Sequence, residues 1–453
     1  SGAASIGRIL MPALVEGFAL REGLQSQREE GDTGFVYILS DRDSGTERAR
    51  FAFRLTSSDE GFADLLADEA DIVMSLRAIR PDEVQRADQA GLGDLAAPGH
   101  SRILARDALV VAVAPGQPLR RVGLAALVRV LSGAETGWPA LGLPGDGPIA
   151  LHLPVDGSDL AQILQATLMK PADATFAATA RRLEGGAHLA QTVAGTPGAL
   201  GFVLRSDLGD AAALALGTGC GTAIPPAARE IASDDYPLVV PLRLYQPMRR
   251  LPPLARGFMA YTRSAAAQLV VRRAGFIDQL AEETALAGQG ARLAIALQRA
   301  EGEAGLFEVQ RLARHMMRAP RQTLTFRFEP GVERLDALSA ANLDHLVRAV
   351  LDGRFDERRL VFVGFAPDDP RPVDARVDVD DAAPDAGERL AAAVRDALRA
   401  RLIAAGAVPG ETAVASFGAA LPVICEDSAL GRHLGRRVEL WAEPPRAIPR
   451  HGN

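Results

Sequence analysis

Serine hydroxyls stand where two predicted strands end, in the segment of residues 51–80. Apolar and polar residues alternate from 51 to 56, which is the period of a half-buried strand. Thr56, Ser57 and Ser58 follow as N-cap candidates ahead of an acidic first helical turn, and residues 71–75 predict a buried strand that ends at Ser75. In open α/β sheets ligands bind at the carboxyl ends of strands, and free helix N–H groups favour anions. The segment therefore predicts an anion site.

Two further turns carry groups of the same kind. Ser-Gly-Ala-Ala-Ser-Ile-Gly at residues 1–7 precedes an apolar helical pattern, and Asp-Gly-Ser-Asp at residues 156–159 joins a predicted strand to a predicted helix. A glycine-containing turn before a helix presents N–H groups to an anion. Because such turns are common, neither predicts a ligand by itself.

Composition excludes several classes of function. The chain has 453 residues, a net charge of −7, 48% hydrophobic and 24% charged residues, which is typical of an ordinary soluble protein of two to four domains and predicts no affinity for nucleic acid. Lys170 is the single lysine among 50 basic residues, a bias that a GC-rich genome explains. No apolar run reaches the length of a membrane span. The sequence starts abruptly at Ser1, which a removed signal peptide and a trimmed N-terminus explain equally well.

No catalytic or metal-binding constellation is recognisable. The seven histidines are scattered without metal-ligand spacing, and no Ser/His/Asp order is readable. We therefore expect no enzyme activity, no catalytic residue, no metal and no cofactor.

The two cysteines, Cys220 and Cys425, allow two interpretations. Each can be a small buried apolar residue, or they can form a long-range disulfide in an oxidising compartment. Both lie in loop-like contexts, and a disulfide would dock the C-terminal domain on the preceding one.

Strands alternate with helices along most of the chain, which predicts an α/β architecture with a largely parallel sheet. Residues 21–50 are polar and predicted irregular apart from a strand at 35–39, whereas 103–114 predicts a long buried strand. Residues 278–320 predict a helical connector, and a second α/β unit follows. Its residues 366–385 are rich in proline and aspartate and predict a long acidic loop.

Residues 1–277 resemble the phosphate-binding (PstS-type) branch of the periplasmic substrate-binding proteins. The resemblance rests on ordered motifs: the turn at 1–7, Ser-Ser-Asp-Glu-Gly at 57–61, Ala-Asp-Ile-Val-Met-Ser-Leu-Arg at 70–77, and Leu-Ser-Gly-Ala-Glu-Thr-Gly-Trp at 131–138. It implies two α/β lobes around an anion cleft, with a type 2 binding-protein fold. It also implies these lining residues: Ser5, Ile6, Ser57, Ser58, Asp71, Ser75, Gly157 and Ser158. Asp71 would accept a hydrogen bond from a protonated oxyanion, or serve as an ordinary N-cap or turn acceptor.

The chain departs from this family in the second lobe. The family has Arg-x-x-Gly-Ser-Gly-Thr where this chain has Leu-Pro-Val-Asp-Gly-Ser-Asp-Leu at 153–160, so its second glycine becomes Asp159. A carboxylate at this helix N-terminus would repel an anionic ligand. If Asp159 points into the cleft, we expect tight phosphate binding to be lost. Arg77, Arg106 or Arg205 can replace the missing arginine, or be solvated or ion-paired.

Residues 321–446 resemble the OmpA-like (OmpA/MotB C-terminal) domain, whose relatives bind peptidoglycan. Gly-Arg-His-Leu-Gly-Arg-Arg-Val-Glu at 431–439 carries most of this resemblance. It implies four peptidoglycan-contacting positions: Asp368, Arg395, Arg436 and Arg437. The family's aspartate and arginine are shifted here, so the fold is expected to survive better than the binding.

Together these observations predict a periplasmic binding protein for phosphate or a related oxyanion, with an OmpA-like domain for cell-wall association and an ABC transporter permease as a partner. The alternative is a structural or interaction protein of the envelope built on two degenerate binding folds. The predicted domains are a binding domain at 1–277, the connector at 278–320, the OmpA-like domain at 321–446 and a tail at 447–453. Lobe 1 comprises about 1–105 and 240–277, and lobe 2 about 106–239.

Overall fold

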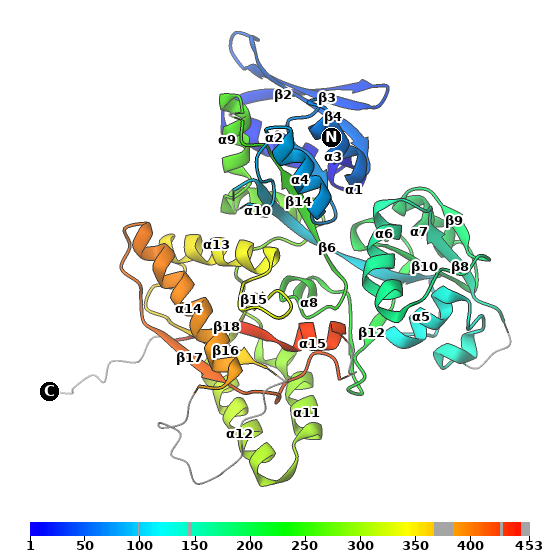
Figure 1. The fold of residues 1–453 in the computed structure, drawn as a ribbon, viewed down its shortest axis with the longest axis vertical. Helices are drawn as coiled ribbons and strands as arrows, with labels where there is room; N and C mark the ends of the chain where they lie inside the picture. The colour runs from blue at the N-terminus through cyan, green and yellow to red at the C-terminus, as the bar shows by residue number, and fades with distance from the viewer. Residues whose placement is uncertain (98, 144–146, 250, 367–383, 426–428, 445–453) are drawn as a thin grey trace. The chain divides into compact units, whose positions relative to one another are not determined.

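The computed structural model describes the chain except for residues 98, 144–146, 250, 367–383, 426–428 and 445–453. The fold is mixed α/β, as the alternation of strands and helices predicted (Figure 1), and the chain forms two compact units. The prediction of a largely parallel sheet is wrong, because β6 (Ser101–Val113), β14 (Val239–Tyr245) and the hairpin of residues 24–41 pair antiparallel with their neighbours. Unit 1 comprises Ser1–Ala215 and Leu238–Gln279, and unit 2 comprises Leu216–Pro237 and Leu280–Asn453. Within the described part of the chain, no helix is both long and apolar enough to cross a membrane.

Unit 1 is built on one eleven-stranded sheet that divides into two halves. Its order is β2-β3-β4-β1-β5-β14-β6-β10-β8-β9, and β11 also pairs with β6. The strands are β1 (Gly2–Ala3), β2 (Leu24–Gly31), β3 (Gly34–Asp41), β4 (Glu47–Thr56), β5 (Val73–Ser75), β6 (Ser101–Val113), β8 (Ala150–Pro154), β9 (Arg181–Leu183), β10 (Ala199–Leu204), β11 (Ala212–Ala213) and β14 (Val239–Tyr245).

Strand β6 joins the two halves. Its residues 101–108 pair with β14, and its residues 109–113 pair with β10. Thirteen residues of nearly continuous apolar sequence suit a strand that is buried along most of its length. The half with β1 to β5 and β14 is called lobe 1 below, and the half with β8 to β10 is called lobe 2; Figure 1 shows β6 running through both.

Helices flank both lobes. Lobe 1 carries α1 (Ala4–Gly7), α2 (Leu10–Arg21), α3 (Ser58–Leu66), α4 (Pro81–Gln89), α9 (Pro253–Tyr261) and α10 (Ala265–Arg273), and lobe 2 carries α5 (Leu124–Ser132), α6 (Asp159–Leu164), the π-helix η2 (Gln165–Met169), the short 3-10 helix η3 (Lys170–Ala172) and α7 (Gly186–Ala194). The prediction that residues 21–50 are mostly irregular is wrong, because β2 and β3 form an antiparallel hairpin there. Strand β2 is polar and exposed, so it lacks the alternation that reveals a half-buried strand.

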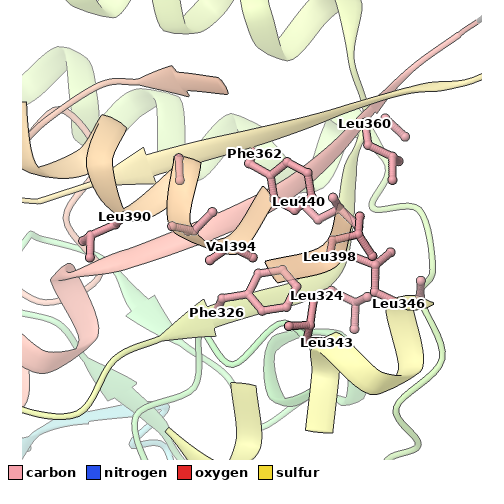
Figure 2. Packing of buried hydrophobic residues seen from close by; sticks show 14 of the residues in the cluster. Leu324, Phe326, Leu343, Leu346, Leu360, Phe362, Leu390, Val394, Leu398 and Leu440 are labelled. Atoms are coloured by element: carbon pink, nitrogen blue, oxygen red, sulfur yellow. The ribbon is translucent and has the colours of Figure 1, made fainter. Parts of the chain in front are cut away.

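Unit 2 contains a four-stranded sheet of order β15-β18-β16-β17 that is covered on both faces. The strands are β15 (Arg321–Arg327), β16 (Arg359–Phe365), β17 (Thr412–Ser416) and β18 (Arg437–Glu443). Alternate residues of β16 point to opposite sides: Leu360 and Phe362 pack with α13 (Ala337–Leu351) and α14 (Ala386–Ala404), as Figure 2 shows, whereas Val361 and Val363 pack against α11 (Gly290–Arg299) and α12 (Gly302–Arg318). The predicted helical connector is therefore the second layer of this unit.

A segment of residues 216–237 leaves the sheet of unit 1 and joins unit 2. It contains β13 (Ala223–Ile224) and α8 (Ala228–Ala232). Asp235 accepts hydrogen bonds from Arg321 at 2.6 and 3.0 Å, and Asp234 accepts one from Arg327 at 2.5 Å. The predicted lobe 2, about 106–239, includes this segment, whereas the structure places it in unit 2. That the predicted domains are a binding domain and an OmpA-like domain stays a prediction.

Candidate anion site in unit 1

The N-terminus of α3 supplies the first group of the site. Ser57 caps the helix, because its hydroxyl accepts from the Glu60 amide at 3.2 Å while the Glu60 carboxylate accepts from the Ser57 amide at 3.1 Å. The hydroxyl of the fully buried Ser58 accepts from the Leu76 amide at 3.0 Å. These contacts hold the first turn of the helix rigidly and leave the amide of Ser58 to donate outside the helix.

A carboxylate from the other lobe takes that donor. Both oxygens of Asp159 accept from the Ser58 amide, at 3.0 and 3.1 Å. Asp159 is the first residue of α6. The preceding residue, Ser158, caps this helix, because its hydroxyl accepts from the Ala161 amide at 3.3 Å. Burial raises the pKa of the Asp159 carboxyl, and the hydrogen bonds from Ser58 oppose that shift. A carboxylate of the chain itself thus accepts from the N-terminus of α3, a position whose free N–H group and helix dipole favour an anion.

Asp59 organises the charged side chains beside this contact. Arg77 donates to Asp59 at 2.9 Å through Nε, and also to Glu83 at 2.8 Å. Arg80 lies 3.1 Å from Asp59 and donates to Gln162 at 2.6 Å, and Gln162 donates to Asp59 at 2.9 Å. Both arginines therefore already have carboxylate partners.

A cavity of about 600 Å³ adjoins this network, a volume in the range of small-molecule pockets. Residues of both lobes line this cavity. The lining residues are Leu76, Arg77, Arg80, Asp156, Gly157, Ala161, Gln162, Ile163, Gln165, Ala166, Thr167, Lys170, Phe176, Val239, Val240 and Pro241.

The structure brings part of the predicted site together. Ser58 meets the turn that holds Gly157 and Ser158, through the carboxylate of Asp159. Gly157 lines the cavity and has a φ of 80°, which favours glycine. The buried Ser75, the last residue of β5, donates its hydroxyl to the Arg77 carbonyl at 2.8 Å. Its neighbour Leu76 donates to Ser58, so Ser75 lies close to the N-terminus of α3.

Other predicted residues lie apart from the cavity lining. Ser5 and Ile6 belong to the short helix α1, where Ile6 is fully buried. The carboxylate of Asp71 is 68% exposed and pairs with Arg249 at 2.9 Å.

The other two arginine candidates donate to backbone carbonyls of residues outside the cavity lining. The buried Arg106 donates to the Asp278 carbonyl at 3.4 Å, and Arg205 donates to the Gly275 carbonyl at 3.4 Å. Sequence reasoning had missed Gln162 and Lys170 as lining residues. The helical position of Gln162, three residues after Asp159, and the rarity of lysine in this chain were the signals that could have found them.

The predicted peptidoglycan residues of unit 2 have separate surroundings. Arg437 is fully buried and donates to Glu439 at 2.8 Å and to the Leu421 carbonyl at 2.9 Å, and burial lowers its pKa to about 10. Arg436 lies over the ring of Phe328 at 5.9 Å, and Arg395 pairs with Asp396 at 2.8 Å on α14. Asp368 and most of the predicted acidic loop lie outside the described residues.

Cys220 and Cys425 form a disulfide, and both belong to unit 2. The bridge therefore ties the segment of residues 216–237 to the rest of its own unit. Over the described ranges, no cluster of three or more His, Cys, Asp or Glu side chains is arranged to hold a metal ion.

Comparisons with known proteins concern mainly the N-terminal part of the chain. A sequence profile described as a PBP superfamily domain matches residues 38–266. Similar solved structures include an ABC-type phosphate transport receptor from Vibrio cholerae (19% identity, TM-score 0.46, covering 61% of this chain and 98% of the receptor). A putative phosphate ABC transporter substrate-binding protein with bound phosphate from Clostridium perfringens is also similar (18% identity, TM-score 0.46, 61% and 97%). No curated protein sequence matches the chain significantly.

Proposed function

The chain belongs to the PBP superfamily, and from that premise we propose that unit 1 binds a small oxyanion such as phosphate between its two lobes. One observation carries the proposal: the Ser58 amide at the N-terminus of α3 already holds an oxyanion, the carboxylate of Asp159, at 3.0 and 3.1 Å. Backbone amides at a helix N-terminus recognise the charge and the oxygen atoms of an anion rather than the rest of the molecule. The same donor therefore suits phosphate.

Asp159 sets the affinity of this site. A hydrogen bond to a charged group is worth about 1.5–3 kcal/mol, so an incoming phosphate must replace an interaction of similar strength. It must also approach a second negative charge if Asp159 stays ionised nearby. We therefore expect weak phosphate binding by the natural chain and stronger binding when the carboxylate is neutralised.

Calorimetric titration of the full chain with phosphate tests this. Asp159→Asn removes the charge with little change of shape and is expected to lower the phosphate Kd at least tenfold, which corresponds to about 1.4 kcal/mol. Asp156→Asn is the matched control, because Asp156 lies in the same turn and lines the cavity but pairs with Arg182 at 3.1 Å. An equal gain in both variants, or no phosphate binding by a folded Asp159→Asn protein, contradicts the proposal.

Unit 2 supplies the second part of the proposed function, which is association with the cell wall in the periplasm. The motif at residues 431–439 supports it, and a disulfide suits an oxidising compartment. Unit 1 would then present its ligand to an ABC transporter permease. Co-sedimentation of the full chain with peptidoglycan sacculi tests the wall association, and a chain that stays in the supernatant contradicts it. Arg436→Gln, which removes an arginine outside the buried ion network, is expected to reduce the bound fraction.

A structural or interaction protein of the envelope is the second candidate, and two contacts favour it. The carboxylate of Asp159 accepts from the Ser58 amide in unit 1, and the predicted peptidoglycan residue Arg437 is fully buried and paired with Glu439 in unit 2. Stabilisation by ligand separates the candidates, because a true binder gains about 2.7 kcal/mol at a hundredfold excess of ligand over Kd. A chain that neither phosphate nor peptidoglycan fragments stabilise contradicts the proposal of phosphate and cell-wall binding and favours this second candidate.

A further inference from the structure

The cavity in unit 1 has a polar wall that the contact between Asp159 and Ser58 leaves unused. Gln165 and Thr167 belong to the π-helix η2, and Lys170 follows at the start of η3. All three line the cavity, and they come from one continuous segment of lobe 2. Short π-helical turns often occur at functional sites.

Lys170 differs from the other charged residues of the cavity lining in its ion pairing. Arg77 is paired with Asp59 and Glu83, Arg80 with Asp59, and the carboxylate of Asp156 with Arg182. Among the residues that the structure describes, no carboxylate lies within ion-pairing distance of the Lys170 ammonium. An ammonium group beside a cavity favours an anionic group of a ligand.

The remaining lining is mostly apolar. Ile163, Ala166 and Phe176 come from lobe 2, and Val239, Val240 and Pro241 come from β14. The volume of about 600 Å³ exceeds what an inorganic oxyanion fills, and burial of an organic group against such side chains contributes about 25 cal/mol per Å² of apolar surface.

We propose that the cavity binds an organic oxyanion, with the anionic head at Lys170 and an apolar body along Phe176 and Val240. Thr167 and Gln165 supply neutral hydrogen-bond groups beside the head, and Asp159 stays on the Ser58 amide. The inference rests on the proposed function in that it takes the space between the lobes as the ligand site. It differs from it in the class of ligand and in the cation that recognises the head.

Titration calorimetry with three probes tests this on the full chain: hexyl phosphate, inorganic phosphate and hexanol. Hexyl phosphate carries both the head and the body, whereas each of the other probes lacks one. We expect hexyl phosphate to bind the natural chain at least tenfold more tightly than either of them. Lys170→Gln is expected to weaken hexyl phosphate binding about tenfold or more, because it removes the charged hydrogen-bond donor. Arg181→Gln, which removes an exposed positive charge from β9 outside the cavity lining, is expected to leave it unchanged.

The single lysine allows an independent readout. Acetylation of Lys170, followed by mass spectrometry of its peptide, reports one side-chain amine in the whole chain. Hexyl phosphate at saturating concentration is expected to slow this acetylation at least fivefold, and hexanol is expected to leave its rate unchanged.

The outcomes also separate the two proposals. Equal affinity for hexyl phosphate and inorganic phosphate overturns the inference, as does unchanged hexyl phosphate binding by Lys170→Gln. If Asp159→Asn then binds inorganic phosphate tightly, the proposed function stands although the inference has failed. Preference for hexyl phosphate that depends on Lys170, without phosphate binding by Asp159→Asn, supports the organic ligand and contradicts phosphate as the ligand of unit 1.

Discussion

Opening the disulfide between Cys220 and Cys425 is expected to destabilise unit 2 and to leave unit 1 unchanged. The bridge joins cysteines separated by 205 positions in the chain. For a loop of that length, loss of conformational freedom in the unfolded chain corresponds to about 5 kcal/mol, with smaller values usual in practice. This is an upper limit for unit 2, because the loop contains Leu238–Gln279 of unit 1, which stay ordered while unit 2 unfolds. We therefore expect reduction, or the double variant Cys220→Ala/Cys425→Ala, to lower the free energy of unfolding of unit 2 by about 3–5 kcal/mol.

The two tryptophans make the units separately observable. Trp138 lies in unit 1 and Trp441 in unit 2, and both are buried. In a Trp138→Phe background, urea unfolding followed by tryptophan fluorescence reports unit 2 alone. The converse variant, Trp441→Phe, reports unit 1 and serves as the control.

The expected result is a lower urea midpoint for the Trp441 signal on reduction, and an unchanged midpoint for the Trp138 signal. An unchanged Trp441 midpoint in the reduced chain would refute the reasoning, because the bridge would then not constrain the unfolded state of unit 2. A shift of the Trp138 signal as large as that of Trp441 would refute the assignment of residues 216–237 to unit 2 alone.

Two further predictions use the same fluorescence signals. Burial raises the pKa of Asp107 to about 6, so its contribution to stability is greatest below pH 3.8 and is lost as the pH rises from 3.8 to about 6, by about 3 kcal/mol. Asp107→Asn is therefore expected to flatten the pH dependence of the Trp138 transition between pH 4 and 7, and an unchanged profile contradicts this. In unit 2, a Cβ on Gly364 would lie 1.9 Å from the Gly387 carbonyl oxygen, so Gly364→Ala is expected to cost about 1–3 kcal/mol in the Trp441 transition. Gly410→Ala, where the added methyl meets open space, is the control, and equal effects of both would exclude the steric explanation.

Local patterns in the sequence were sufficient for the main elements of unit 1. The apolar run at 103–114 predicted β6, which spans Ser101–Val113, and the N-cap candidates at 56–58 predicted the start of α3 to within a residue or two, with Ser57 as the actual cap. These features follow from interactions between residues that are close in the sequence, namely burial of alternate or successive side chains and hydrogen bonds within one helical turn. The alternation of strands and helices likewise predicted the α/β class.

The tertiary structure alone decided which groups meet. Ser58 and Asp159 are 101 positions apart, and whether the carboxylate meets the amide depends on the placement of α6 relative to α3. The sequence therefore determined that a carboxylate stands at the start of α6, but not that it accepts from the amide at the N-terminus of α3. The sequence also could not show that residues 216–237 belong to unit 2. The disulfide and the buried ion pairs that hold them there join segments that are far apart in the sequence. Hydrophobic periodicity encodes which face of an element is buried, whereas the partner of a polar side chain is set by how the elements pack.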